Sequence, residues 1–315
     1  MTFNNLVKNI CNTYENGKSQ AYKEINTILL KTYWQIGKHI VEYEQKGEKR
    51  AKYGSKLIKR ISKDLTKKYE KGFSIDSIER IRRFYLTYKN SATLLRNLNW
   101  TKYLELIKIY SKTERSFYEI KCLKENWSIR DLKRQIKSNL YYRIPNKSNN
   151  KLITTSQENI IKDPYILEFL KLNEKHSEKD LENSIIKNLE KFLFELGKEF
   201  SFIKRQYRIN ISKNNYYVDL VFFNNKLNCY FLIDLKIGKI NSKDIGQMNL
   251  YINYFKENIN SNKHTNPIGL ILGKTKNNIE IKYAKGNLNN NLFTSKYLLH
   301  LPSKEDIKNY LGDRL

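Results

Sequence analysis

Residues 216–236 read YYVDLVFFNNKLNCYFLIDLK, two apolar stretches joined by a short polar segment. This pattern predicts two β-strands, Tyr216–Phe223 and Cys229–Lys236, that form a hairpin. A four-residue loop would set Asp219 directly opposite Asp234. Any even-length loop would still keep the two carboxylates on one face of the sheet.

Lys236 lies on the same face, because it follows Asp234 by two residues. The rest of both strands is apolar, and burying two like charges together costs roughly several kcal/mol unless a cation or a proton intervenes. A magnesium ion would remove the repulsion, since it prefers carboxylate oxygens and keeps water ligands for chemistry. The Lys236 ammonium would then orient or deprotonate the attacking water. The structural alternative is an ordinary salt pair between Asp234 and Lys236 on a half-exposed sheet.

A third carboxylate, Glu182, precedes these strands on a predicted helix from Ser177 to Gly197. At roughly 100° per residue, the apolar residues of this helix cover an arc of about 140°. Glu182 falls inside the arc and is the only charged residue there between Leu181 and Leu196. A carboxylate in a core-facing stripe is explained if it points at the same metal. The alternative is a glutamate that benefits from the helix dipole while its stem packs.

Gln247 and Tyr251 lie four residues apart on the next predicted helix, Ser242–Phe255, and therefore share a face. Their spacing alone is typical of ordinary helix surface or core.

The whole C-terminal half alternates between strand and helix patterns. Further strands are expected at Phe200–Ile211, near Ile268–Leu272 and near Ile279–Tyr283, which indicates an α/β domain. A polar stretch with a proline and no apolar period precedes it. The sequence therefore predicts a helical domain over 1–142, a linker over 143–158 and an α/β domain over 159–315.

The first 142 residues are predicted to be helical throughout. Apolar residues recur at steps of three and four over Tyr22–Tyr43, and Leu57–Leu65 marks another helix. Ser74 is placed to cap a third, and a capping box at Ser128 opens a helix through Leu140.

Two of these helices would present a basic surface. Their apolar residues would pack together through Leu57, Ile61, Leu65, Ile78, Ile81 and Tyr85, leaving Lys59, Lys63, Lys67, Arg80 and Arg83 in solvent. A helix-turn-helix-like unit could contact DNA phosphates in this way. The alternatives are a merely solvated face and a module for protein interaction or dimerisation.

Composition favours a polyanionic partner. The 315 residues include 59 Lys and Arg against 32 Asp and Glu, a formal charge of +27. Part of this excess reflects AT-rich codons, since Asn, Ile and Tyr are also abundant. Three separated cysteines and the lack of a leader or of a run of ~20 apolar residues predict a cytoplasmic protein without a membrane segment. The four histidines lack zinc-site spacing, so any metal would be held by oxygen.

A helix Glu, then Asp, then (Asp/Glu)-x-Lys on a hairpin resembles the PD-(D/E)XK nucleases. More closely, almost the entire chain resembles the bacterial YhcG-type family of PD-(D/E)XK proteins. The segments that carry this resemblance are KDPY at 162–165, SEKDLE at 177–182, RQY at 205–207, VDL at 218–220, DLKIGK at 234–239, GQMNLY at 246–251 and, in the helical half, YWQIG at 33–37, GFS at 72–74 and RRFY at 82–85.

The resemblance implies an all-α N-terminal domain followed by an α/β restriction-endonuclease-like domain with a mixed central sheet. It implies that Mg²⁺, or Mn²⁺ in its place, is bound by Asp219, Asp234 and the main-chain carbonyl of Leu235, with help from Glu182. Lys236 would serve the attacking water.

Gln247 with Tyr251 is similar to the Q-x-x-x-Y element of RecB-like nucleases, which would place both near the site and DNA. Lys239 in the DLKIGK segment is a further candidate for DNA contact. The sequence departs from the family pattern at Val218, where the motif name has proline, and at Asp234, where relatives usually carry Glu. The shorter acid could change the metal spacing or preference.

We therefore expect an Mg²⁺-dependent DNA endonuclease, and the resemblance suggests genome defence, DNA repair or mobile-element processing. The alternative is a DNA-binding or regulatory protein with an inactive nuclease fold. RNA as a substrate and a homodimer as the assembly both stay open.

Overall fold

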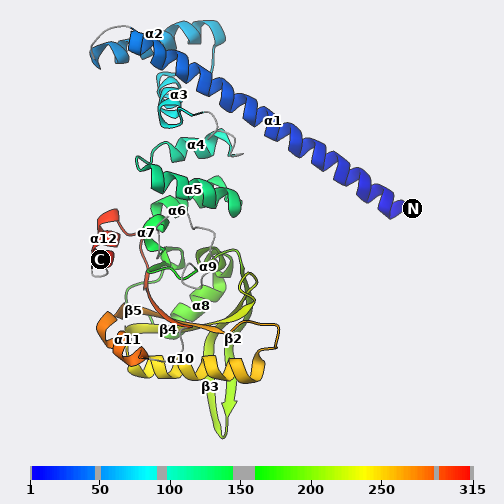
Figure 1. The fold of residues 1–315 in the computed structure, drawn as a ribbon, viewed down its shortest axis with the longest axis vertical. Helices are drawn as coiled ribbons and strands as arrows, with labels where there is room; N and C mark the ends of the chain where they lie inside the picture. The colour runs from blue at the N-terminus through cyan, green and yellow to red at the C-terminus, as the bar shows by residue number, and fades with distance from the viewer. Residues whose placement is uncertain (1, 47–50, 91–97, 145–159, 287–290, 313–315) are drawn as a thin grey trace. The chain divides into compact units, whose positions relative to one another are not determined.

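The computed structural model describes residues 2–46, 51–90, 98–144, 160–286 and 291–312. The chain divides into two compact units, Met1–Arg134 and Gln135–Leu315 (Figure 1). The division therefore falls before the predicted domain end at 142. Arg143, predicted to begin the linker, is buried in the second unit, where its Nη1 lies 2.6 Å from Oε1 of Glu195. Residues 145–158 of the predicted linker lie outside the described residues.

In the described part of the first unit, every regular element is a helix. The helices are α1 (Phe3–Lys46), α2 (Ala51–Tyr69), α3 (Ile75–Thr87), α4 (Trp100–Leu106), α5 (Lys112–Lys124) and α6 (Ile129–Lys137), within which the division between the units falls. The Ser74 hydroxyl caps α3 as predicted, accepting from the Ser77 N–H at 3.2 Å. The predicted Ser128 capping box is also present. However, α6 ends before Leu140, because Asn139 adopts a left-handed conformation with φ 52°.

Apolar side chains of α1, α2 and α3 form the packed part of this unit. Ile40, Ile58 and Ile78 are buried together. Ile61, predicted to pack against Ile78, Ile81 and Tyr85, packs against this cluster, to which α1 also contributes. At Gly37 the backbones of α1 and α3 approach so closely that a Cβ would lie 2.6 Å from the Ile81 carbonyl oxygen.

The described part of the second unit contains a six-stranded sheet in the order β1-β6-β5-β4-β3-β2. Its strands are β1 (Tyr165–Ile166), β2 (Phe200–Ile211), β3 (Asn214–Asn224), β4 (Cys229–Ile240), β5 (Ile268–Lys276) and β6 (Leu292–Leu298). Strands β2, β3 and β4 pair antiparallel, whereas β4, β5, β6 and β1 pair parallel. The sheet is therefore mixed, as the resemblance implied.

Helices cover both faces of this sheet (Figure 1). Helices α8 (Glu178–Lys187) and α9 (Leu189–Leu196) pack on one face with Leu220, Phe222 and Ile233. Helix α10 (Ser242–Tyr254), continued by a π-helical turn over Phe255–Ile259, and α11 (Asn278–Lys285) pack on the other. The remaining short elements are α7 (Leu140–Arg143), a 3-10 turn over Glu168–Leu170 and α12 (Lys304–Gly312). No helix in the described ranges is long and apolar enough to cross a membrane.

Two predicted elements of this unit were wrong. The strand expected near Ile279–Tyr283 is helix α11, which Asn277 caps through its side-chain oxygen. Its alternating apolar residues mimic a strand, yet Ile279 and Tyr283 are 68% and 81% exposed. The single helix expected from Ser177 to Gly197 is interrupted at Asn188. Glu195, which lies beyond this break, is fully buried, so Glu182 is not the only buried acid of the region.

Candidate active site

Asp219 and Asp234 lie where β3 and β4 stop pairing. The ladder runs from Asn224↔Cys229 to Leu220↔Ile233, so the loop has four residues, the length expected to set the two aspartates opposite each other, and the next pair in register would be Asp219 with Asp234. Instead of continuing the ladder, the main-chain N–H of Leu235 donates to Oδ2 of Asp219 at 2.8 Å. The strands therefore part at the two aspartates and leave the carboxylates free to face a ligand.

Asp234 is the most buried acid of this group, with 2% of its surface exposed. Its Oδ2 lies 2.9 Å from Nζ of Lys236 but has no partner of hydrogen-bond geometry among the described residues. Burial, and then the negative charge of Asp219, raise the pKa of Asp234 to about 7 although Lys236 opposes the shift. The Lys236 ammonium therefore does not fully offset the cost of burying this ionised carboxylate beside Asp219.

Lys236 lies on β4 between acidic neighbours. Burial by itself lowers the pKa of its ammonium, but Asp234 and more distant carboxylates together raise the pKa above its ordinary value. One of these is Asp244, whose Oδ1 is 4.0 Å from Nζ. Lys236 is therefore a cation in this structure, able to hold a water or a phosphate oxygen.

Glu182 lies on α8, and side chains of strand β2 connect it to the site. It is 6% exposed, its Oε1 is 3.1 Å from Nε of Arg205, and its Oε2 accepts from Nε2 of Gln206 at 2.7 Å. The same Gln206 amide donates to Oδ1 of Asp219 at 3.0 Å. The predicted metal contact of Glu182 stays a prediction, whereas its place beside Asp219 is a feature of the fold.

Gln206 is the site residue that the sequence reasoning missed. The pattern offered one usable signal: a two-residue turn at Ser212 and Lys213 would pair Ile211 with Asn214, which puts Gln206 opposite Asp219. That step required the hairpin of β2 and β3 to be recognised first.

Gln247 and Tyr251 approach the same group from α10. Nε2 of Gln247 donates to the Tyr251 hydroxyl at 2.5 Å, and that hydroxyl donates to the Tyr217 carbonyl at 2.9 Å. Burial, followed by the charge of Asp234, raises the pKa of Tyr251 to about 12. The pair therefore lies near the aspartates, and its contact with DNA stays a prediction.

The remaining predicted DNA contacts are occupied within the chain. Nζ of Lys239 lies 2.6 Å from Oε2 of Glu280. In the first unit, Nη2 of Arg80 lies 3.6 Å from Oδ2 of Asp76, and the Arg83 guanidinium lies 5.2 Å from the ring centre of Tyr110. The two exposed ion pairs, of Lys239 and Arg80, are weak enough to be exchanged for phosphates.

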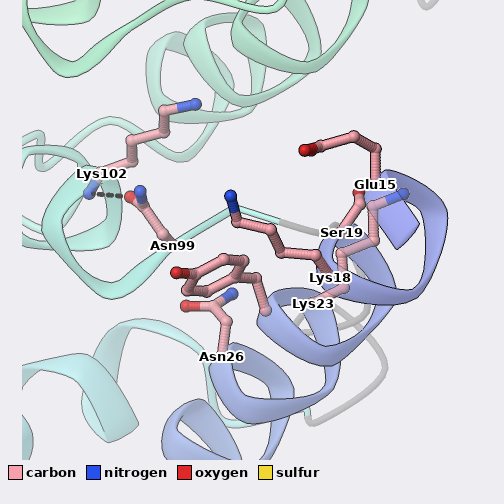
Figure 2. A pocket seen from close by; sticks show the side chains of 8 residues that line it. Glu15, Lys18, Ser19, Lys23, Asn26, Asn99 and Lys102 are labelled. Carbon is pink, nitrogen blue, oxygen red and sulfur yellow. Dashed lines mark hydrogen bonds between the residues drawn. The ribbon is translucent and has the colours of Figure 1, made fainter. Parts of the chain in front are cut away.

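The first unit also has a polar cavity of about 440 Å³ beside α1 and the start of α4. Figure 2 shows that Lys18 and Lys23 of α1 and Lys102 of α4 line it, together with Glu15. Three ammonium groups against one carboxylate favour an anionic group here.

The aspartate pair fits a hard divalent cation. No described group of three or more His, Cys, Asp or Glu side chains is arranged to hold a metal, so a closed protein cage is not part of this structure. Two carboxylates, with main-chain oxygen and water completing the shell, are the ligand set that Mg²⁺ prefers. The buried Oδ2 of Asp234, which makes an ion pair with Lys236 but no hydrogen bond within the described residues, would be one of the ligand atoms.

Comparisons with known proteins match both units. Residues 158–312 match the family described as "YhcG PDDEXK nuclease domain", and residues 9–143 match the one described as "DUF1016 N-terminal domain". The chain is 34% identical over 344 residues to the Escherichia coli (strain K12) protein "Putative nuclease YhcG", which covers 96% of this chain and 92% of the relative.

Similarity to solved structures is more limited. A repair endonuclease from Pyrococcus abyssi covers 42% of this chain and 50% of its own at 22% identity, with a TM-score of 0.29. A structure described as an EndoMS-dsDNA complex covers 38% and 46% at 14% identity, with a TM-score of 0.25. The two family models match both units, and the Escherichia coli relative matches nearly the full length of the chain. By these matches the chain belongs to the YhcG family of PDDEXK nuclease-domain proteins.

Proposed function

We propose that this protein is a DNA endonuclease that hydrolyses phosphodiester bonds with Mg²⁺, or Mn²⁺ in its place, held by Asp219 and Asp234. The observation that carries the proposal is the buried Asp234 carboxylate, which lies next to Asp219 and pairs with Lys236. A purely structural acid at this depth would have its oxygens satisfied by protein donors. Oδ2 of Asp234 has the Lys236 ammonium at 2.9 Å, but this contact lacks hydrogen-bond geometry, and no other donor among the described residues bonds to the atom.

Each residue has a role that follows from its place. Asp219 and Asp234 would hold the metal, with the Leu235 carbonyl as a third oxygen ligand. When bound, the ion supplies a polarised water and neutralises charge on the scissile phosphate. Lys236 holds the nucleophilic water or a phosphate oxygen, because its ammonium lies at the edge of the carboxylate pair. Gln247 and Tyr251 would hold the nucleic acid backbone from α10.

Two observations support DNA as the substrate class. The chain carries a formal charge of +27, which favours a polyanion. It also belongs to a nuclease family, and the family assignment rests on both of its units. The first unit would add affinity through Arg80, Arg83 and neighbouring lysines of α2. Defence against foreign DNA, repair and processing of mobile elements all need such an activity.

The compartment that we propose is the cytoplasm. Cys11, Cys122 and Cys229 are all free, and two of them are buried. Free buried thiols are typical of proteins that fold under reducing conditions.

The test is a cleavage assay on supercoiled plasmid with the full chain and Mg²⁺, Mn²⁺ or EDTA. We expect nicked or linear products with either metal and none with EDTA. Asp234→Asn protein serves as the control for contaminating nucleases, and a labelled RNA of matched length distinguishes the two nucleic acids. A protein that shifts DNA with and without metal but cuts under neither condition would be a binding protein with an inactive nuclease fold.

A further inference from the structure

One side-chain amide connects two acids of the site that belong to different layers. Nε2 of Gln206 donates to Oε2 of Glu182 at 2.7 Å and to Oδ1 of Asp219 at 3.0 Å. Glu182 belongs to α8, on one face of the sheet, and Asp219 belongs to β3 within it. The two N–H groups of one amide are therefore both used between carboxylates.

The backbone of β2 aims Gln206 at this place. Arg205 pairs with Leu220 and Tyr207 pairs with Val218, so Gln206 faces Asp219 across the hairpin. Gln206 has a φ of 47°, the left-handed region that residues other than glycine rarely adopt. Such conformations persist where the surrounding structure demands them, and they cluster at functional sites. The ladder is also irregular just before, between Phe202 and Lys204.

The amide completes the set of donors around Asp219. Oδ1 accepts from Gln206, while Oδ2 accepts from the Leu235 N–H at 2.8 Å. With one donor on each oxygen, the carboxylate plane is fixed, and each oxygen keeps a lone pair for a cation. Loss of Gln206 would leave Asp219 free to rotate about its terminal torsion.

Glu182 is approached by two side chains of strand β2. Its Oε2 accepts from Gln206, and its Oε1 lies 3.1 Å from Nε of Arg205 without hydrogen-bond geometry, so both oxygens lie against side chains of strand β2. In this arrangement its connection to Asp219 runs through the Gln206 amide. The nitrogen between the two carboxylates occupies the position that a cation shared by both would need.

We propose that Gln206 is a positioning residue of the nuclease site, and that Glu182 acts through Gln206 on Asp219 and is not itself a metal ligand. This inference rests on the proposed function. Partners that orient metal ligands through hydrogen bonds typically change metal affinity or activity by about 10- to 100-fold when they are removed.

The experiment is a double-mutant cycle on the full chain with Gln206→Met, Glu182→Ala and the combined variant. Mn²⁺ affinity is measured by calorimetry without DNA, and plasmid cleavage is measured in parallel. Methionine keeps the length of the side chain but has no donor. We expect each single variant to lose about 10- to 100-fold in Mn²⁺ affinity, and the double variant to lose no more than the more impaired single variant.

Asn210→Ala is the matched control, because the Asn210 amide also donates from β2 to β3, to Oδ1 of Asn215 at 3.0 Å, but on the exposed part of the hairpin. It should leave Mn²⁺ affinity and cleavage unchanged. If Gln206→Met does not fold, Gln206→Asn takes its place, since asparagine tolerates the left-handed region but its amide is one methylene too short. Glu182→Gln keeps an oxygen acceptor for Gln206 and should stay within a few-fold of the wild type in Mn²⁺ affinity.

Multiplying losses in the double variant would show that Glu182 binds the metal independently, and would overturn the inference. Unchanged affinity in a folded Gln206 variant would overturn it as well. Both results leave the nuclease proposal in place as long as wild-type protein binds Mn²⁺ and cuts. Wild-type protein that neither binds Mn²⁺ nor cuts DNA would instead refute the proposed function, together with the inference that depends on it.

Discussion

The substitution Asp234→Asn separates the catalytic role of this buried acid from its effect on stability. The change keeps the shape of the side chain but removes the charge that a metal would need. We expect cleavage to fall by at least about a hundredfold, because a metal contributes several kcal/mol of transition-state stabilisation. DNA binding should be equal or tighter, since one negative charge leaves the site.

The same substitution should stabilise the protein without metal. Burial and Asp219 raise the pKa of Asp234 from 3.8 to about 7, which corresponds to about 4 kcal/mol of preference for the neutral form in the folded state. The folded protein therefore loses stability as the pH rises through the range from about 4 to about 7, and this cost is complete above pH 7. Asparagine is neutral throughout, so its advantage should be largest at pH 8 and smaller at pH 5.

Thermal unfolding in EDTA at both pH values measures this difference, and plasmid cleavage with Mg²⁺ measures the activity. We expect the melting temperature of Asp234→Asn at pH 8 to exceed that of the wild type by at least a few degrees. Asp306→Asn is the control, because this acid lies on an exposed helix cap at Ser303, outside the proposed machinery. Wild-type cleavage by Asp234→Asn would refute the site, and a lower melting temperature at pH 8 would refute the argument from buried charge.

Four further outcomes are expected. Lys236→Ala should reduce turnover by about a hundredfold or more while leaving Mn²⁺ affinity unchanged. Single-turnover cleavage measures the rate and calorimetry measures the affinity, and an unchanged rate would show that the role assigned to Lys236 is wrong. Glu182→Gln should impair cleavage less than Asp219→Asn does, and a Mn²⁺ titration that ranks them in the reverse order would contradict this. Arg80→Ala with Arg83→Ala should lower DNA affinity and flatten the slope of log K against log salt by roughly one unit per lost contact; an unchanged slope at unchanged fold would assign this surface to protein partners. Mn²⁺ affinity should rise from pH 6 to pH 8, because the proton on the buried acid competes with the metal, and calorimetry in two buffers should detect its release.

Local pattern predicted the elements whose residues carry their own signal. The apolar runs around Asp219 and Asp234, the four-residue loop between them and the caps at Ser74 and Ser128 all depend on residues that are close in sequence. Burial of Asp234 followed from the apolar residues on both faces of its strand, whereas Asp219 is half-buried. For these features, the contacts that determine the structure are made between residues close together in the sequence.

Elements with an ambiguous local signal were settled by packing. Ile279, Ile281 and Tyr283 alternate with other residues as they would in a strand. The segment is a helix, because Asn277 caps its start and only Ile281 of the three is buried. Strand β6 was not predicted, because its place beside β5 is set by parallel pairing with residues more than 20 positions away. Pairing with a distant strand produces no periodic pattern in the sequence.

The strand character of β3 and β4, the parity of their hairpin and the face shared by Asp219 and Asp234 were thus determined by the sequence, because spacing along a strand decides which side chains share a face. The meeting of Glu182 with Asp219 was decided only by the tertiary structure. It depends on the left-handed backbone of Gln206 and on the packing of α8 against the sheet. Both depend on contacts between segments distant in the chain, and the spacing of residues along the sequence does not predict such contacts.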